Sequence, residues 1–209
     1  YHEKTLPVLQ FYKDKSQQYD VDGILQDARV LDIGSNCGFV AVYCAKRAKT
    51  VTAVELNPYL NKIAIDTAQY FKLDNINVVE DDFVTYTTAQ KFDVILSLSN
   101  HHTIDGNLYM SFEEYIKKIV SMLSPDGYLL FESHNVFGPG LGGVGDDGDM
   151  ELKVAIMNKY FDITRYRMVN CFLKHGKGDI NKLFIVARLN STPKQVDFNL
   201  AEAKQKFAY

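Results

Sequence analysis

The stretch that decides the fold is Val30-Leu31-Asp32-Ile33-Gly34-Ser35-Asn36-Cys37-Gly38-Phe39. Its first four residues are typical of a short buried strand, and a helical pattern runs from Phe39 to Lys46. Gly34 and Gly38 lack a Cβ, so the backbone between strand and helix can approach a ligand closely. The spacing is not the Gly-x-Gly-x-x-Gly that brings a pyrophosphate to a helix amino end. With Asp32 at the strand end, the loop suits a cationic ligand better than an anionic one.

Strands and helices alternate along the chain on either side of this stretch. Further strands are predicted at 51–54, 77–79, 94–96 and 128–132, with helices at 57–71, 111–123 and 152–160. Alternation predicts parallel strands joined by crossover helices. Two consecutive strands, 163–169 and 183–187, predict an antiparallel hairpin at the sheet edge. The expected fold class is therefore α/β: a doubly wound, mostly parallel seven-stranded sheet with helices on both faces.

Local signals mark the starts and turns of these elements. Asn57-Pro58 suits a helix start, since Asn caps the helix and Pro fits its first turn. Ser111 and Glu114 have the spacing of a capping box. Ser124-Pro125-Asp126-Gly127 is typical of a turn before the fifth strand.

Acidic residues follow the second and third predicted strands. Glu55 lies 23 positions after Asp32, and an acidic residue about 20 positions past such a loop can accept both ribose hydroxyls. Asp82 follows the third strand, where a carboxylate can accept an exocyclic amine of adenine, and Phe83 can pack on the ring. Glu80 and Asp81 also fit a solvated acidic turn. Ligands of open α/β sheets bind beyond the carboxyl ends of the strands, so these loops predict one adenosyl site.

Five motifs in this order resemble the series of the class I S-adenosylmethionine-dependent methyltransferases. They are V-L-D-I-G-x-x-x-G-F, A-V-E-L-N-P, E-D-D-F, F-D-V-I-L-S-L-S and L-S-P-D-G-Y-L-L-F, between Val30 and Phe131. The chain departs from the family at Ser35-Asn36-Cys37, where glycine is common.

The resemblance implies S-adenosylmethionine as cofactor, with S-adenosylhomocysteine as product. It places the methionine part near Asp32, Gly34, Ser35 and Gly38, the ribose at Glu55, and the adenine at Asp82 and Phe83. Ser97 and Leu98 would line the floor of the site. Asn36 and Leu56 complete the predicted cofactor-binding set.

Histidines gather at the predicted ends of the fourth and fifth strands. His102 and His134 are the candidate general bases for an alcohol or phenol acceptor, because histidine titrates near ambient pH. Glu132 is a second candidate. Each histidine can equally be a structural residue that bonds only the backbone.

The charge of the chain narrows the range of expected acceptors. The net charge of −3 disfavours nucleic acid, because proteins that bind the phosphate backbone of nucleic acids usually carry a basic excess. The predicted acceptor is a small molecule or a glycan or phosphate end group. Ser97-Leu98-Ser99-Asn100 replaces the Asn/Asp-Pro-Pro-Tyr/Phe motif of amide- and adenine-methylating enzymes, which disfavours that class. The alternatives are an RNA methyltransferase and a non-catalytic cofactor-binding subunit; the glycine spacing argues against a nicotinamide enzyme.

One domain is expected over residues 1–209. It comprises an N-terminal cover or substrate segment (1–26), a Rossmann-like core (27–190) and a C-terminal helix (191–209). No apolar run approaches the ~20 residues of a membrane span, and the three cysteines lack a disulfide or zinc pattern, so a cytoplasmic location is expected. No metal site is predicted, and Asp146-Asp147-Gly148-Asp149 is interpreted as part of a flexible loop. The sequence carries no signal for the oligomeric state.

Overall fold

The computed structural model describes residues 21–100, 110–133, 149–171 and 180–206. The chain divides into two compact units, Tyr1–Leu96 and Ser97–Tyr209. Seven strands are assigned, and the predicted fold class, a seven-stranded mixed sheet with helices and a C-terminal antiparallel strand pair, is confirmed. The prediction of one domain over the whole length stays a prediction.

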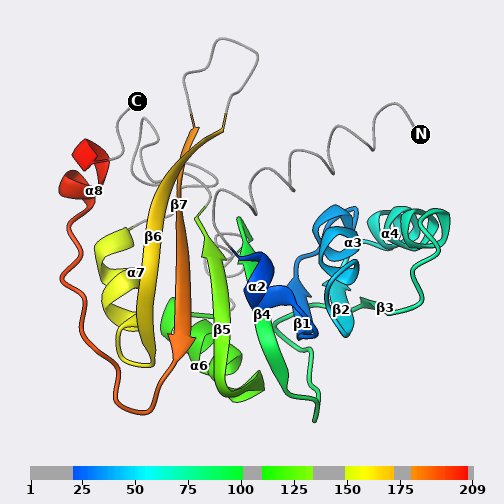
Figure 1. The fold of residues 1–209 in the computed structure, drawn as a ribbon, viewed down its shortest axis with the longest axis horizontal. Coiled ribbons are helices and arrows are strands. Elements are labelled where there is room, and N and C mark those ends of the chain that lie inside the picture. The colour runs from blue at the N-terminus through cyan, green and yellow to red at the C-terminus, as the bar shows by residue number, and fades with distance from the viewer. Residues whose placement is uncertain (1–20, 101–109, 134–148, 172–179, 207–209) are drawn as a thin grey trace. The chain divides into compact units, whose positions relative to one another are not determined.

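The first unit contains the amino-terminal strands of the sheet (Figure 1). Strands β1 (Arg29–Ile33), β2 (Thr50–Glu55) and β3 (Ile76–Glu80) pair in parallel, in the order β3-β2-β1-β4 with β4 (Phe92–Leu98) beside β1. Helix α2 (Asp22–Leu25) precedes β1, while α3 (Phe39–Ala45) and α4 (Pro58–Tyr70) are the crossovers. Because the strands run in the same direction, the loops after β1, β2 and β3 leave from the same edge.

An ion pair and an apolar core hold the first unit together. The guanidinium of Arg29 donates to both carboxylate oxygens of Asp93, over 2.9 Å from Nε and 2.7 Å from Nη2, and so ties β1 to β4. Residues 30–33 of β1 and 51–54 of β2 are buried, as their largely apolar sequences predict for parallel strands.

The second unit contains the antiparallel strands (Figure 1). Strand β7 (Ile180–Leu189) lies between β5 (Leu123–Glu132) and β6 (Phe161–Cys171) and is antiparallel to both. Helices α6 (Phe112–Met122), α7 (Met150–Met157) and α8 (Leu200–Lys206) complete it. Phe112 of α6 meets Phe131 of β5 edge to face, with ring centroids 5.9 Å apart.

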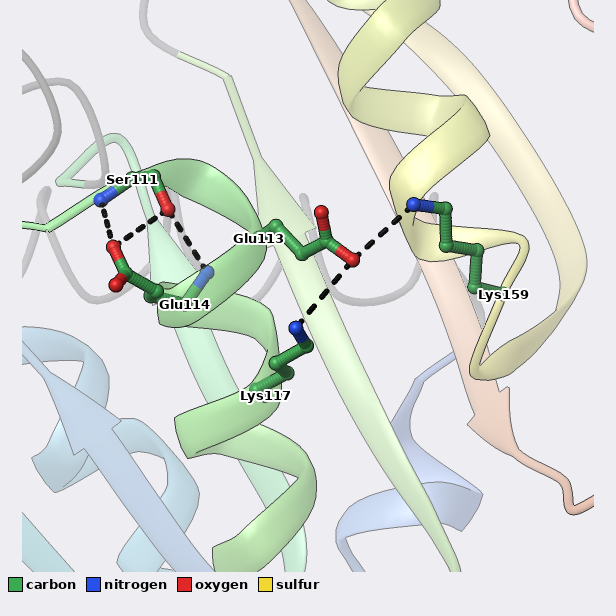
Figure 2. A network of polar contacts seen from close by, with 5 residues as sticks. All are labelled: Ser111, Glu113, Glu114, Lys117 and Lys159. Atoms are coloured by element: carbon green, nitrogen blue, oxygen red, sulfur yellow. Dashed lines mark hydrogen bonds and ion pairs between the residues drawn. The ribbon is translucent and has the colours of Figure 1, made fainter.

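Helix starts form where the sequence predicts them. The Asn57 side chain accepts the backbone N–H of Tyr59 and Pro58 opens α4. Figure 2 shows the capping box of α6, in which Ser111 Oγ accepts from the Glu114 N–H and Glu114 accepts from the Ser111 N–H. Beside it, Glu113 contacts Lys117 one turn along and Lys159 just after α7.

Other boundaries differ from the prediction. The predicted turn 124–127 lies within β5, where Asp126 has a positive φ of 61°. Helix α7 begins earlier than expected because Asp149 caps it by accepting the Leu152 N–H at 2.9 Å. The C-terminal helix begins only at Leu200, and residues 190–199 form neither helix nor strand.

Several predicted features lie outside the described residues. They are most of the N-terminal segment, the glycine loop up to Gly148 and the hairpin tip at 174–178. Among the helices that the structure describes, none combines the length and the apolar character that crossing a membrane requires.

Gly38 gives a direct test of the first unit. It has φ of 71°, and a Cβ there would lie 2.5 Å from the Ala64 Cβ of α4. We expect Gly38→Ala to lower the free energy of unfolding by roughly 2–5 kcal/mol, because left-handed strain and overpacking add. Urea denaturation measures this change. Gly23→Ala is the control, since its Cβ would meet nothing within 4 Å; equal effects of both substitutions would contradict the account.

Candidate cofactor site

The loop after β1 folds back on itself and on β2. Gly34, Asn36 and Gly38 all have positive φ, at 62°, 51° and 71°. The Ser35 N–H donates to the Val54 carbonyl at 3.1 Å, and the Gly38 N–H donates to the Ser35 carbonyl at 2.9 Å. Glycine adopts this conformation freely and asparagine tolerates it. The Ser35-Asn36-Cys37 variation therefore still forms a tight loop at the end of the strand.

Glu55 links this loop to the loop after β2. One carboxylate oxygen of Glu55 accepts the Asn36 backbone N–H at 3.0 Å, and the other accepts the Asn57 N–H at 2.9 Å. The Glu55 carbonyl also accepts the Asn61 side-chain amide and the Asp81 N–H. The residue thus joins the loops after β1, β2 and β3, while its carboxylate, which is only half-buried, keeps acceptor capacity for a ligand.

Asp32 is the most unusual group of the site. Its side chain is 3% exposed, and its Oδ2 has no hydrogen-bond partner among the described residues. Burial, and then the negative charge of Glu55, raise the pKa of Asp32 to about 7, against a stabilising hydrogen bond from the Ala41 N–H. A buried carboxylate without a partner is costly. A cationic ligand group placed there would supply the missing partner.

The remaining predicted residues of the first unit lie on the same edge. Asp82 follows β3 and its Oδ1 accepts the Val84 N–H at 2.8 Å, so the Asp82 carboxylate helps shape the turn. Phe83 is buried, whereas Leu56 is 62% exposed. The Ser35 hydroxyl is buried and has no partner among the described residues. An exposed apolar side chain beside Glu55 can pack on a flat ring.

In the second unit the predicted floor residue Ser97 belongs to a buried polar triad. Its hydroxyl lies 2.7 Å from the Tyr115 hydroxyl and donates to Asn100 Oδ1 at 3.0 Å. Tyr115 also donates to Asn100 Oδ1, at 3.3 Å. Ser97 is fully buried, so its side chain is committed to this triad; Leu98, the other predicted floor residue, is half-buried.

Glu132, a candidate base, lies in an ion pair. Glu132 Oε1 accepts from Lys182 Nζ at 3.0 Å and from Ser99 Oγ at 2.7 Å. Lys182 Nζ also donates to Ser99 Oγ, at 2.6 Å. The sequence prediction missed Lys182, Tyr115 and Asn100. Lys182 shares a face with Glu132, because Glu132 pairs with Phe184 and Lys182 is two residues before it, but that signal exists only once the strand register is known.

The structure thus brings together Asp32, Glu55 and the Gly34–Gly38 loop in the first unit, and Glu132 with Ser99 in the second. The other two candidate bases, His102 and His134, lie outside the described residues.

Comparison with known proteins identifies the family. Residues 12–172 match the model of a methyltransferase domain. The chain is 30% identical over 104 residues to a tRNA1(Val) (adenine(37)-N6)-methyltransferase of Pseudoalteromonas translucida, covering 44% of this chain and 45% of the relative. It is 27% identical over 138 residues to (S)-coclaurine N-methyltransferase of Papaver somniferum, covering 63% of this chain and 35% of the relative. The chain therefore spans less than half the length of either relative.

Among solved structures, the fold is similar to N-methyltransferase NodS from Bradyrhizobium japonicum. The TM-score is 0.67 at 19% identity, covering 88% of this chain and 98% of that one. NodS has also been solved in complex with S-adenosyl-L-homocysteine, and that structure matches with the same TM-score. The family match, the motif order and the acidic loops after three parallel strands agree, and the chain belongs to the class I S-adenosylmethionine-dependent methyltransferase family.

Proposed function

We propose that this protein transfers a methyl group from S-adenosylmethionine to an oxygen of a small molecule or of a glycan or phosphate end group. The observation that carries the cofactor assignment is the buried Asp32 carboxylate, which has an oxygen without a partner among the described residues. A cationic amino-acid group fits that position and a phosphate does not. The family match supports the reaction class.

In this proposal, different residues of the first unit bind different parts of the cofactor. When bound, S-adenosylmethionine supplies an electrophilic methyl group on a sulfonium. Asp32 holds its ammonium, with the backbone of Gly34–Gly38 beside it. Glu55 accepts the ribose hydroxyls while it keeps its two backbone N–H partners. Asp82 faces the adenine amine, and Leu56 and Phe83 provide apolar surface for the ring.

The acceptor assignment rests on the ends of β4 and β5. Ser97 is bonded to Tyr115 and Asn100, so its hydroxyl does not serve an incoming amide or amine. Glu132 is paired with Lys182 and accepts from Ser99, so its Oε1 is already engaged within the protein. The proposal therefore gives the base role to His102 or His134. Both relatives named above methylate nitrogen, according to their names, so an amine acceptor is the main competing outcome, and an RNA acceptor the second.

Substitution of the histidines tests the base. We expect His102→Ala or His134→Ala to lower kcat by about 10²–10⁴-fold, because general-base catalysis contributes a factor of that size. Labelled methyl donor is first offered to hydroxylated small molecules, amines, glycans and RNA to find an acceptor, and turnover of the variants is then measured at saturation. His175→Ala is the control. A wild-type kcat in both variants would show that neither histidine is the general base. Methylation of amines or RNA alone would overturn the assignment of an oxygen acceptor.

Calorimetry with S-adenosylhomocysteine tests whether Asp32 belongs to the cofactor site. We expect Asp32→Asn to weaken binding by about tenfold or more, because a charge-assisted hydrogen bond contributes roughly 1.5–3 kcal/mol. Asp81→Asn is the matched control in the loop after β3, since the Asp81 side chain accepts a hydrogen bond from the neighbouring Thr85 hydroxyl and has no part in the proposed cofactor site. If the two variants bind S-adenosylhomocysteine equally well, the assignment of Asp32 to the cofactor site is wrong.

The same titration has a predictable pH dependence. The pKa of Asp32 is raised from 3.8 to about 7, so the side chain is protonated in the cofactor-free protein below that pH. The charged form binds the ammonium, so affinity is complete above pH 7 and falls about tenfold per unit below it. Adenosine lacks the ammonium and should show no such dependence. A flat profile for S-adenosylhomocysteine between pH 5 and pH 7 would contradict the role of Asp32.

A further inference from the structure

The side chain of Asn61 joins helix α4 to the end of strand β2. Asn61 lies near the start of α4 and is only 4% exposed. Its Nδ2 donates to the backbone carbonyl of Glu55, the last residue of β2, at 2.9 Å. Its own N–H donates to the Asn57 carbonyl at 3.1 Å. The main chain of Glu55 is therefore bonded directly to a side chain of the helix that follows it.

The second polar atom of the Asn61 side chain has no such contact. Asn61 Oδ1 is buried and has no hydrogen-bond partner among the described residues. The orientation of the amide is still defined, because the reverse one would place Oδ1 against the Glu55 carbonyl oxygen, and both atoms are acceptors. A buried oxygen without a partner costs stability, and asparagine is a weaker helix former than leucine or alanine. Helix stability therefore does not account for Asn61, whereas its bond to Glu55 does.

Glu55 is held both at its main chain and at its side chain. Its carboxylate accepts the Asn36 N–H at 3.0 Å and the Asn57 N–H at 2.9 Å. Its carbonyl accepts from Asn61 at 2.9 Å and, over a longer 3.3 Å, from the Asp81 N–H. Groups that bind a ligand must be held within about 0.5 Å of the productive position by the residues around them. Among the four donors to Glu55, only Asn61 lies within a long helix.

We propose that Asn61 is a positioning residue, which sets the Glu55 carboxylate for the two ribose hydroxyls of the cofactor. Asn61 does not touch the cofactor: it fixes the main chain of Glu55, and the carboxylate follows. The inference rests on the proposed function, in which Glu55 binds the ribose. Its geometric part, that Asn61 holds Glu55 against the loop after β1, can be tested without a ligand.

Calorimetry with two nucleosides tests the effect on the ribose. Adenosine carries both ribose hydroxyls and 2′,3′-dideoxyadenosine carries neither, so the ratio of their dissociation constants measures what the hydroxyls contribute. We expect the wild type to bind adenosine about tenfold more tightly or better, because hydrogen bonds to a carboxylate are strong. Asn61→Leu keeps the side-chain volume and should lower this preference by about fivefold or more, with the affinity for dideoxyadenosine unchanged.

A variant of the same helix is the matched control. Thr67 is also 4% exposed, and its Oγ1 donates to the Ile63 carbonyl at 2.7 Å. Thr67→Val therefore removes a buried bond from a side chain to the backbone, as Asn61→Leu does, and should keep the wild-type preference for adenosine. Glu55→Gln should lower the preference. Asn61→Leu added to Glu55→Gln should lower it no further, because residues that act through one contact are not additive.

Two results would overturn the proposal. One is a wild-type preference for adenosine in Asn61→Leu. The other is an equal loss of affinity for both nucleosides, which indicates general damage to the site. Urea denaturation first establishes that each variant is folded. If Asn61→Leu is unfolded, Asn61→Ala takes its place, because it removes the amide without introducing a branched side chain.

Hydrogen exchange of the Asn36 amide gives a readout without ligand. This N–H donates to Glu55 Oε2, so it reports whether the carboxylate keeps its place. We expect it to exchange about tenfold faster in Asn61→Leu, because a weakened contact opens more often, and at the wild-type rate in Thr67→Val. If the wild type binds no adenosine, or binds both nucleosides equally, the proposed role of Glu55 fails. The exchange rate then still decides whether Asn61 holds Glu55, and a wild-type rate in Asn61→Leu would refute it.

Discussion

The proposed cofactor site depends on a carboxylate that the protein buries with one oxygen left without a partner among the described residues. Asp32 lies near the end of β1 among buried apolar residues, and the charge that acts on it most strongly, that of Glu55, has the same sign. Burial and the like charge of Glu55 both disfavour the ionised form of Asp32, and the hydrogen bond from the Ala41 N–H offsets only part of this cost. In the proposed function, a cationic ligand group supplies the partner that Asp32 Oδ2 lacks among the described residues.

Glu55 has the complementary task of holding the backbone in place. It accepts N–H groups from the loops after β1 and β2, and its carbonyl accepts one from the loop after β3. The three loops are thereby tied to one residue, although the residues they connect are far apart in the sequence. Parallel pairing makes this possible, since it places the carboxyl ends of β1, β2 and β3 next to one another. The acidic side chains are therefore arranged before any ligand binds, which reduces the entropy lost on binding.

Much of this could be predicted from the sequence because the signals are local. The caps of α4 and α6 depend on residues two or three positions apart, and both form as predicted. The tight loop after β1 follows from Gly34 and Gly38, and the edge shared by Asp32, Glu55 and Asp82 follows from strand alternation. In contrast, the Lys182–Glu132 pair spans 50 positions, and a one-residue change of register would place Lys182 on the opposite face. Similarly, Ser97 turns to Tyr115, on a helix that the sequence predicts without specifying how it packs.

The position of strand β7 in the second unit affects how the strands can pair during synthesis of the chain. It lies between β5 and β6, yet it follows both in the sequence, and its pairing joins Tyr128 to Arg188. On the ribosome, β6 emerges before the strand that separates it from β5. The edge of β5 that β7 covers therefore stays without its partner until β7 has emerged, and such an open edge invites pairing with other chains. The nascent protein is thus open to intermolecular strand pairing for the whole interval between the synthesis of β5 and that of β7.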